Sequence, residues 1–270
     1  MNQDISICVL TENEMGWTEP FELDKVQILD NYYLSAQKSD IAFLKKMDTA
    51  RLLAGFRTTA GIDTKGVRPY GGWEDSLLGG HCVGHYLTAL AQAVKVTGDK
   101  ELKEKSQTLI AGLEECQKKL GTGFLFGAKV EDKEDVEKQF DILEGKKKGE
   151  TWVPWYNMHK VLAGLVDTYK YTGNETALLV AEKLGDWIYE RVSKWDLKTN
   201  QKVLETEYGG MNDCLYELYS YSHNKHHLEA AQKFDEKALF LMAAKGEKNC
   251  LDGKHANTQI PKFIGAIKRY

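Results

Sequence analysis

Residues 170–174 read KYTGN and follow an apolar run that is typical of a buried helix. Similar turns occur as KVTGD at 95–99 and, in degenerate form, as SYSHN at 220–224. A fourth copy of the preceding helix begins at Asn257 and breaks off at Tyr270. Because the later copies recur about every 50 residues, the sequence predicts a repeat architecture of helix pairs. We expect the full pattern to continue in a turn and a partner helix.

Buried helices alternate with amphipathic ones along the chain. The buried type is rich in small and apolar residues, whereas the amphipathic type carries one apolar stripe among charges. We expect inner helices at about 76–96, 155–171, 211–221 and 258–270. We expect outer helices at about 100–120, 175–192 and 226–244, after an opening helix at 39–56. These roughly eight helices predict an all-α fold: an incomplete (α/α)6 toroid, or else an open solenoid.

The stretch at 130–150 interrupts the repeat and is dense in Lys, Glu and Asp. We interpret it as a solvated excursion over the rim rather than a linker between domains. Residues 1–270 would then form the N-terminal portion of a single barrel domain. Pro261 is expected near the first turn of the last inner helix, where its missing N–H does no harm.

Composition excludes several classes of partner. The chain has 270 residues, 42% of them hydrophobic and 28% charged, as in an ordinary globular protein. Its net charge of −4 gives no basic surface for nucleic acid or an anionic membrane. The sequence contains neither a long apolar run nor a secretory signal pattern. The five scattered cysteines are typical of free thiols in a reducing compartment, so we expect a cytoplasmic protein.

In a layered ring, the loops that lead into the inner helices collect at one mouth. The unusual residues of this chain lie in those loops: Tyr70, Trp73, Glu74, His81 and His85; Trp152, Trp155, Tyr156, Asn157 and His159; Glu207, Gly209, Gly210 and Asp213; His255 and Asn257. Aromatic faces beside carboxylates, amides and imidazoles suit a sugar, whose C–H face stacks while its hydroxyls take directional hydrogen bonds. A carbohydrate is therefore the expected partner.

Several of these residues have a structural alternative. His81 and His85 have the i, i+4 spacing of paired metal ligands, but without a HExxH pattern we favour packing and hydrogen bonding and assign no metal site. His159 is either a satisfied core histidine or a ligand-binding one. Glu207 and Glu74 suit contact or support better than catalysis. The histidines at 223, 226 and 227 read as a solvated chance cluster.

Four phrases carry a resemblance to a known family. They are YGGWEDSLLGGHCVGHYLTALAQAVKVTGD (70–99), WVPWYNMHKVLAGLVDTYKYTGN (152–174), EYGGMNDCLYELY (207–219) and GKHANTQIPKFIGAIKRY (253–270). They resemble the bacterial DUF1680 proteins, the β-L-arabinofuranosidase-like glycoside hydrolases of family 127. The resemblance runs from residue 56 to the last residue and implies an (α/α)6 catalytic barrel that acts on glycans carrying L-arabinofuranose.

The resemblance also implies retaining hydrolysis by a cysteine nucleophile, with a glutamate acid/base and a zinc ion held by glutamate and cysteines. No position of this sequence matches those motifs, so the catalytic residues stay unassigned. We expect no cofactor in this chain and zinc only in the full-length family domain. The sugar-binding residues carry over as follows: His159 and His255 match positions expected to touch the sugar, with Trp73, Glu74, His85, Trp155, Asn157, Glu207 and Asn257 as neighbours.

We therefore expect part of a family 127-like glycoside hydrolase that lacks the nucleophile and zinc motifs and has little or no activity alone. The alternative is a non-catalytic carbohydrate-binding module, or a subunit completed by a second chain. Another toroid enzyme, such as a sugar epimerase or an unsaturated-glucuronide hydrolase, is a weaker alternative. The open edge of the ring also predicts exposed apolar surface and self-association.

Overall fold

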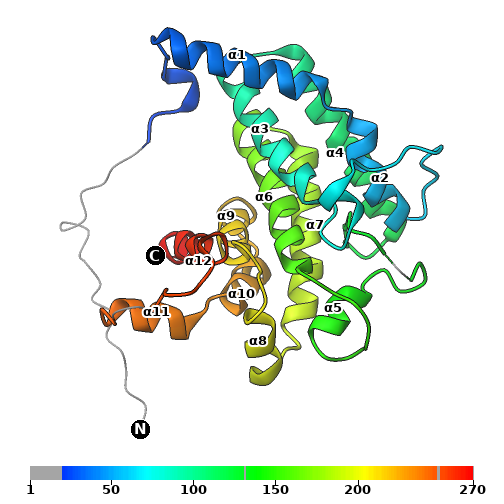
Figure 1. Cartoon of the computed structure of the whole chain (residues 1–270), viewed down its shortest axis with the longest axis vertical. Helices are drawn as coiled ribbons and strands as arrows, with labels where there is room; N and C mark the ends of the chain where they lie inside the picture. The colour runs from blue at the N-terminus through cyan, green and yellow to red at the C-terminus, as the bar shows by residue number, and fades with distance from the viewer. Residues whose placement is uncertain (1–19, 131, 248–249, 270) are drawn as a thin grey trace.

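Inner and outer helices alternate in the computed structural model, which describes residues 20–130, 132–247 and 250–269 (Figure 1). The inner helices are α3 (His81–Thr97), α6 (Pro154–Thr172), α9 (Met211–Ser222) and α12 (Ala256–Arg269). The outer helices are α4 (Lys100–Leu120), α7 (Glu175–Val192) and α10 (Lys225–Lys233). The remaining elements are η1 (Leu23–Lys25), α1 (Asn31–Lys46), α2 (Thr49–Thr59), η2 (Gly72–Asp75), α5 (Lys138–Leu143), α8 (Leu197–Leu204) and α11 (Lys237–Ala244).

Each layer is built from neighbours in the repeat. In the inner layer, α3 packs against α6, α6 against α9, and α9 against α12, while in the outer layer α4 contacts α7 and α7 contacts α10. The described ranges contain no β-strand. The prediction of an all-α, incomplete (α/α) toroid is confirmed. None of the helices described is both long and apolar enough to cross a membrane.

The recurring phrase forms the turn between an inner and an outer helix. Gly98 and Gly173 end their helices with φ of 66° and 67°, in the left-handed region that favours glycine. His223 takes the same conformation with φ of 52° at the degenerate copy. The residue after each turn caps the next helix by accepting a backbone N–H: Asp99, Asn174 and Asn224. The turn chemistry thus explains why the phrase recurs.

Two expected helices are each broken into two. The helix expected at 39–56 ends at Lys46, and a new helix follows because the Asp48 carboxylate accepts the N–H groups of Ala50 and Arg51. The helix expected at 226–244 is likewise α10 and α11. Pro261 lies in the second turn of α12, inside the helix, and not in its first turn as expected.

The charged insertion is packed and not merely solvated. It contains α5, whose Phe140 is fully buried among other aromatic rings. Arg191 of α7 forms ion pairs with three of its carboxylates: Glu137, Asp141 and Glu144. The sequence interpretation missed this because the charges that suggest a solvated segment are paired to a residue about 50 positions away.

Candidate functional site

A buried carboxylate closes the loop between η2 and α3. Glu74 Oε2 accepts a hydrogen bond from the Gly80 N–H at 2.9 Å, and Oε1 accepts one from the Cys82 N–H at 3.2 Å. Oε1 also lies 2.8 Å from Nδ1 of His81. Burial raises the pKa of Glu74, but the hydrogen bonds from His81, Gly80 and Cys82 outweigh it, so the pKa lies below its usual value. Glu74 is therefore an ionised anchor of this loop.

His81 is the centre of the first cluster. Its Nδ1 lies 2.8 Å from the Leu78 carbonyl oxygen and 2.8 Å from Glu74 Oε1. Because both partners are acceptors, Nδ1 carries the proton. Burial lowers the pKa of His81, but the Cys82 and Glu74 side chains raise it to about 10. The other ring nitrogen, Nε2, lies 3.7 Å from Cys82 Sγ.

Three further rings surround His81. Trp73 of η2, His85 of α3 and Tyr156 of α6 have ring centroids 6.4, 6.2 and 6.4 Å from that of His81. Trp73 is 66% exposed, so a ligand can reach this side chain. Burial, followed by the nearby Lys160 charge, lowers the pKa of His85 to about 4. At neutral pH His85 is an uncharged imidazole that can donate or accept a hydrogen bond.

His159 forms a second cluster with the loop before α9. Its ring is buried, and Nδ1 accepts a hydrogen bond from the Gly210 N–H at 2.9 Å. Burial, and to a lesser extent the Lys160 charge, lowers the pKa of His159 well below its usual value. The neutral ring therefore carries its proton on Nε2 and is a donor there. A Cβ on Gly209 would collide with Nδ1, so the Gly-Gly sequence gives the loop room to reach the ring.

Tyr156 connects the two clusters. Its ring lies near His81, and a Cβ on Gly209 would be only 3.2 Å from a carbon of the same ring. Lys160 Nζ sits 4.7 Å from the ring centroid. The η2–α3 loop, the start of α6 and the loop before α9 thus form one continuous candidate site.

Two expected sugar contacts lie in the core instead. Trp155 is fully buried, and its ring packs against four others: Phe140, Trp187, Trp195 and Phe234. Asn157 is 1% exposed and donates from Nδ2 to the Leu77 carbonyl oxygen at 3.2 Å. Both side chains point inward from α6, so Trp155 fills the core and Asn157 supports the loop that carries Glu74.

The remaining expected residues are more loosely placed. Glu207 is half-buried and stands two residues before Gly209. His255 and Asn257 are exposed at the start of α12. In the described ranges no hydrogen bond or ring contact joins these two side chains to His81 or His159. Pro261 of the same helix does lie beside Gly210, because a Cβ added to that glycine would be 3.2 Å from the proline Cβ.

Sequence reasoning missed Cys82 and misread His227. Cys82 was one of five scattered thiols, and its only signal was its position directly after His81. Within the described part of the chain, one group of metal-ligating side chains has ligand atoms within 4.8 Å of one another: Glu74, His81 and Cys82.

His227 was expected to be solvated but is fully buried. Its ring nitrogens lie 2.8 Å from Ser222 Oγ and 3.2 Å from the Glu182 carbonyl oxygen.

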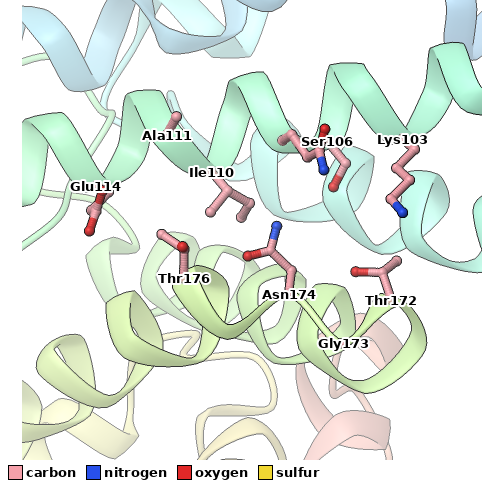
Figure 2. Close-up of a pocket in the computed structure, with 10 residues that line it drawn as sticks. Lys103, Ser106, Ile110, Ala111, Glu114, Thr172, Gly173, Asn174 and Thr176 are labelled. Atoms are coloured by element: carbon pink, nitrogen blue, oxygen red, sulfur yellow. The ribbon is translucent and has the colours of Figure 1, made fainter.

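A groove of about 420 Å³ lies apart from these clusters, in the outer layer (Figure 2). It runs between α4 and the start of α7, and polar side chains line it: Lys103, Ser106, Gln107, Glu114, Thr172, Asn174 and Thr176. No aromatic ring lines it, so it has no stacking surface for a sugar face. The clusters around His81 and His159 remain the better candidate site.

Comparison with known proteins gives a family and a fold. Residues 25–270 match the family described as β-L-arabinofuranosidase, GH127 catalytic domain. The chain is also similar to the crystal structure of Ara127N-Se, a GH127 β-L-arabinofuranosidase from Geobacillus Stearothermophilus T6. The two share 16% sequence identity with a TM-score of 0.54, over 85% of this chain and 36% of that chain. That likeness concerns the fold. No curated protein matches the sequence.

Proposed function

This chain belongs to the GH127 β-L-arabinofuranosidase family, and we propose that it binds glycans carrying L-arabinofuranose as part of a glycoside hydrolase. The observation that supports this most directly is the state of His159. The Gly210 amide holds its buried ring as a neutral Nε2–H donor, and half-buried Tyr156 connects it to the cluster that carries exposed Trp73. A fixed donor next to stacking surfaces is the arrangement that a sugar requires.

The residues around His81 would supply the rest of the contact. The exposed Trp73 ring is placed to stack on the C–H face of a furanose. Neutral His85 would donate to or accept from a hydroxyl. Glu74 would support this surface and not touch the sugar, because its oxygens already accept hydrogen bonds from the loop. We include His255, Asn257 and Glu207 as sugar contacts through the family resemblance alone.

The zinc ion of the family does not fit the residues described. The resemblance implies a site of one glutamate with cysteines, whereas Glu74 lies beside a single cysteine, Cys82, and a histidine. Both Glu74 oxygens already accept N–H groups. We derive no catalytic step through this ion. We propose that the hydrolytic groups are absent from this sequence, which would form the N-terminal portion of a single (α/α)6 domain and have little or no activity alone.

Calorimetric titration with arabinofuranosyl oligosaccharides tests the binding proposal. Trp73→Ala should weaken binding about 10-fold, since loss of one stacking contact costs about 1–1.5 kcal/mol. His159→Gln should weaken glycan binding more than Trp73→Ala does. Near-ultraviolet circular dichroism checks that this variant keeps its native packing. Tyr32→Ala removes an exposed ring of α1 and is the matched control. Equal losses in Tyr32→Ala and Trp73→Ala would contradict the assigned site.

Turnover assays test the activity proposal separately. The purified chain, incubated with arabinofuranosides with and without added zinc, should release no arabinose. Zinc-independent turnover would show that the chain carries its own catalytic groups. Binding without turnover would support the binding proposal and leave the assignment of the site intact.

A second candidate function is a non-catalytic glycan-binding unit that assembles with another chain. The exposed apolar face of α12 favours it: Ile260, Ile264 and Ile267 are 60%, 45% and 75% exposed at i, i+4 and i+7. We propose that the chain self-associates through this face.

We also propose a cytoplasmic location. Free thiols at Cys82, Cys116, Cys214 and Cys250 support it, because thiols stay reduced in that compartment.

A further inference from the structure

His81 and Cys82 bring a nitrogen and a sulfur ligand atom close together. Nε2 of His81 lies 3.7 Å from Sγ of Cys82. Two ligands of one tetrahedral zinc-type ion are about 3.6 Å apart, given bonds of about 2.3 Å to sulfur and about 2.0–2.1 Å to nitrogen. The observed separation therefore matches the span between two ligands of one ion. Cys82 is half-buried, so the sulfur is not sealed in the core.

The surroundings of His81 already have the form of a metal-ligand support. Nδ1 is committed as a donor to the Glu74 carboxylate and the Leu78 carbonyl oxygen. This bonding directs the Nε2 lone pair, once deprotonated, toward Cys82. A metal-ligating histidine usually has a carboxylate or carbonyl hydrogen-bonded to its far nitrogen, because that partner orients the ring and strengthens its basicity.

We propose that Cys82 Sγ and His81 Nε2 bind a thiophilic divalent transition-metal ion, with Glu74 as the supporting carboxylate. The donor set, thiolate plus imidazole, selects ions such as zinc or cobalt over magnesium or calcium. Binding replaces the protons on Sγ and Nε2 with the ion, and the protons pass to solvent. The remaining coordination positions are open to water or to an oxygen of a ligand.

This site is different from the zinc site that the family resemblance implies. It combines a histidine with one cysteine, and both ligands lie in the first turn of α3. It also goes beyond sugar binding, because the ion would bind whether or not a glycan occupies the neighbouring aromatic surface. Failure of the metal test and failure of the glycan titration are therefore independent results.

Titration of the chain with cobalt(II), under a non-thiol reductant, tests the proposal. We expect a near-ultraviolet thiolate-to-cobalt charge-transfer band that saturates at about one ion per chain and disappears when zinc is added. Cys82→Ser should abolish the band. Glu74→Gln should keep the band but weaken affinity about 10- to 100-fold, as loss of the group that orients a ligating histidine does.

Cys250→Ser is the matched control, because Cys250 is another half-buried free thiol and lies far along the chain, before α12. It should leave the band unchanged. A titration that gives no charge-transfer band would overturn the proposal. So would a band that persists in Cys82→Ser or is lost in Cys250→Ser, because cobalt would then be bound by a different thiol.

Discussion

Gly84 and Gly164 lie against each other where α3 crosses α6. A Cβ on Gly84 would collide with the Lys160 carbonyl oxygen, and a Cβ on Gly164 would be 2.5 Å from the Gly84 carbonyl oxygen. The two helix backbones therefore touch without intervening side chains. Lys160 and His159 lie on α6 just before this crossing, and His85 follows Gly84 on α3. The contact thus sets the distance between the two clusters of the candidate site.

Gly84→Ala should accordingly be severely destabilising. The new methyl group would have to push two backbones apart, and overpacking of this kind costs about 1–3 kcal/mol or more. We expect a lower midpoint in urea unfolding and weaker glycan binding, because the cluster around His81, which includes His85, would move away from the cluster around His159. Gly71→Ala is the control, since Gly71 has an ordinary φ of −71° and no atom within 4 Å of an added Cβ. Equal unfolding midpoints for the two variants would contradict the close crossing.

Much of the fold could be predicted from the sequence because its strongest signals are local. The outer helices at 100–120 and 175–192 were predicted at the bounds observed, since each starts at a capping residue next to a glycine turn. The breaks at Asp48 and between α10 and α11 were missed. There the apolar pattern continues past the break, and a cap or a single residue decides the helix end.

The candidate site was less predictable because membership of a loop does not decide which way a side chain points. Trp155 and Trp73 were both expected at the mouth of the ring, yet one fills the core and the other is exposed. Cys82 could not be identified as a candidate ligand from the sequence, because the hydrogen bonds of His81 decide that its ring faces Cys82. Those depend on Glu74, which a tight loop brings back to the helix start.

His223 predicts a stabilising substitution. It holds a left-handed φ of 52° at the position where the other two turns have glycine. This conformation costs a residue with a Cβ about 1–2 kcal/mol, which glycine avoids at the price of a more flexible unfolded chain. His223→Gly should therefore raise the free energy of unfolding by about 1 kcal/mol in urea titrations. Lys65→Gly, at φ of 51°, should act in the same direction. A loss of stability in both variants would refute the argument.

Arg191 predicts how the insertion is held. Its Nε lies 2.6 Å from an oxygen of Glu144, whose side chain is completely buried. Arg191→Met would remove the cation that all three carboxylates share and leave Glu144 with Lys146 and Asp141 with Lys147 as their remaining partners. We expect a cost of about 1.5–3 kcal/mol, the net contribution of a hydrogen bond to a charged group. Hydrogen exchange should then show early opening of α5. Lys118→Ala breaks only an exposed pair with Glu114 and should change stability by less than about 0.5 kcal/mol. Slow exchange of α5 in Arg191→Met would argue against the anchor.

The apolar face of α12 predicts concentration-dependent association. Ile264 and Ile267 are exposed on one side of this helix, so a second copy could cover them. Sedimentation velocity should show the wild-type chain as a dimer or larger species that dissociates on dilution. The double variant Ile264→Glu, Ile267→Glu should sediment as a monomer. Leu179→Glu places the same charge at an exposed leucine of α7 and should still associate. A wild-type monomer at all concentrations would contradict the proposed interface.

His227 predicts a loss of stability in acid. Its Nε2 faces the Glu182 carbonyl oxygen and, at 3.4 Å, the Asp186 carboxylate, while Nδ1 faces Ser222 Oγ; exposed His226 adjoins it. Burial lowers its pKa in spite of Asp186, so below about pH 6.5 the unfolded chain binds a proton that the folded chain resists. Stability should thus fall with pH, by at most about 1.4 kcal/mol per pH unit from this residue. His227→Gln should be less stable at pH 8 but show a shallower acid slope in urea titrations. The other histidines contribute to the acid slope of the wild type and of the variant alike. Equal slopes for the two proteins would therefore contradict the lowered pKa of His227 in the folded chain.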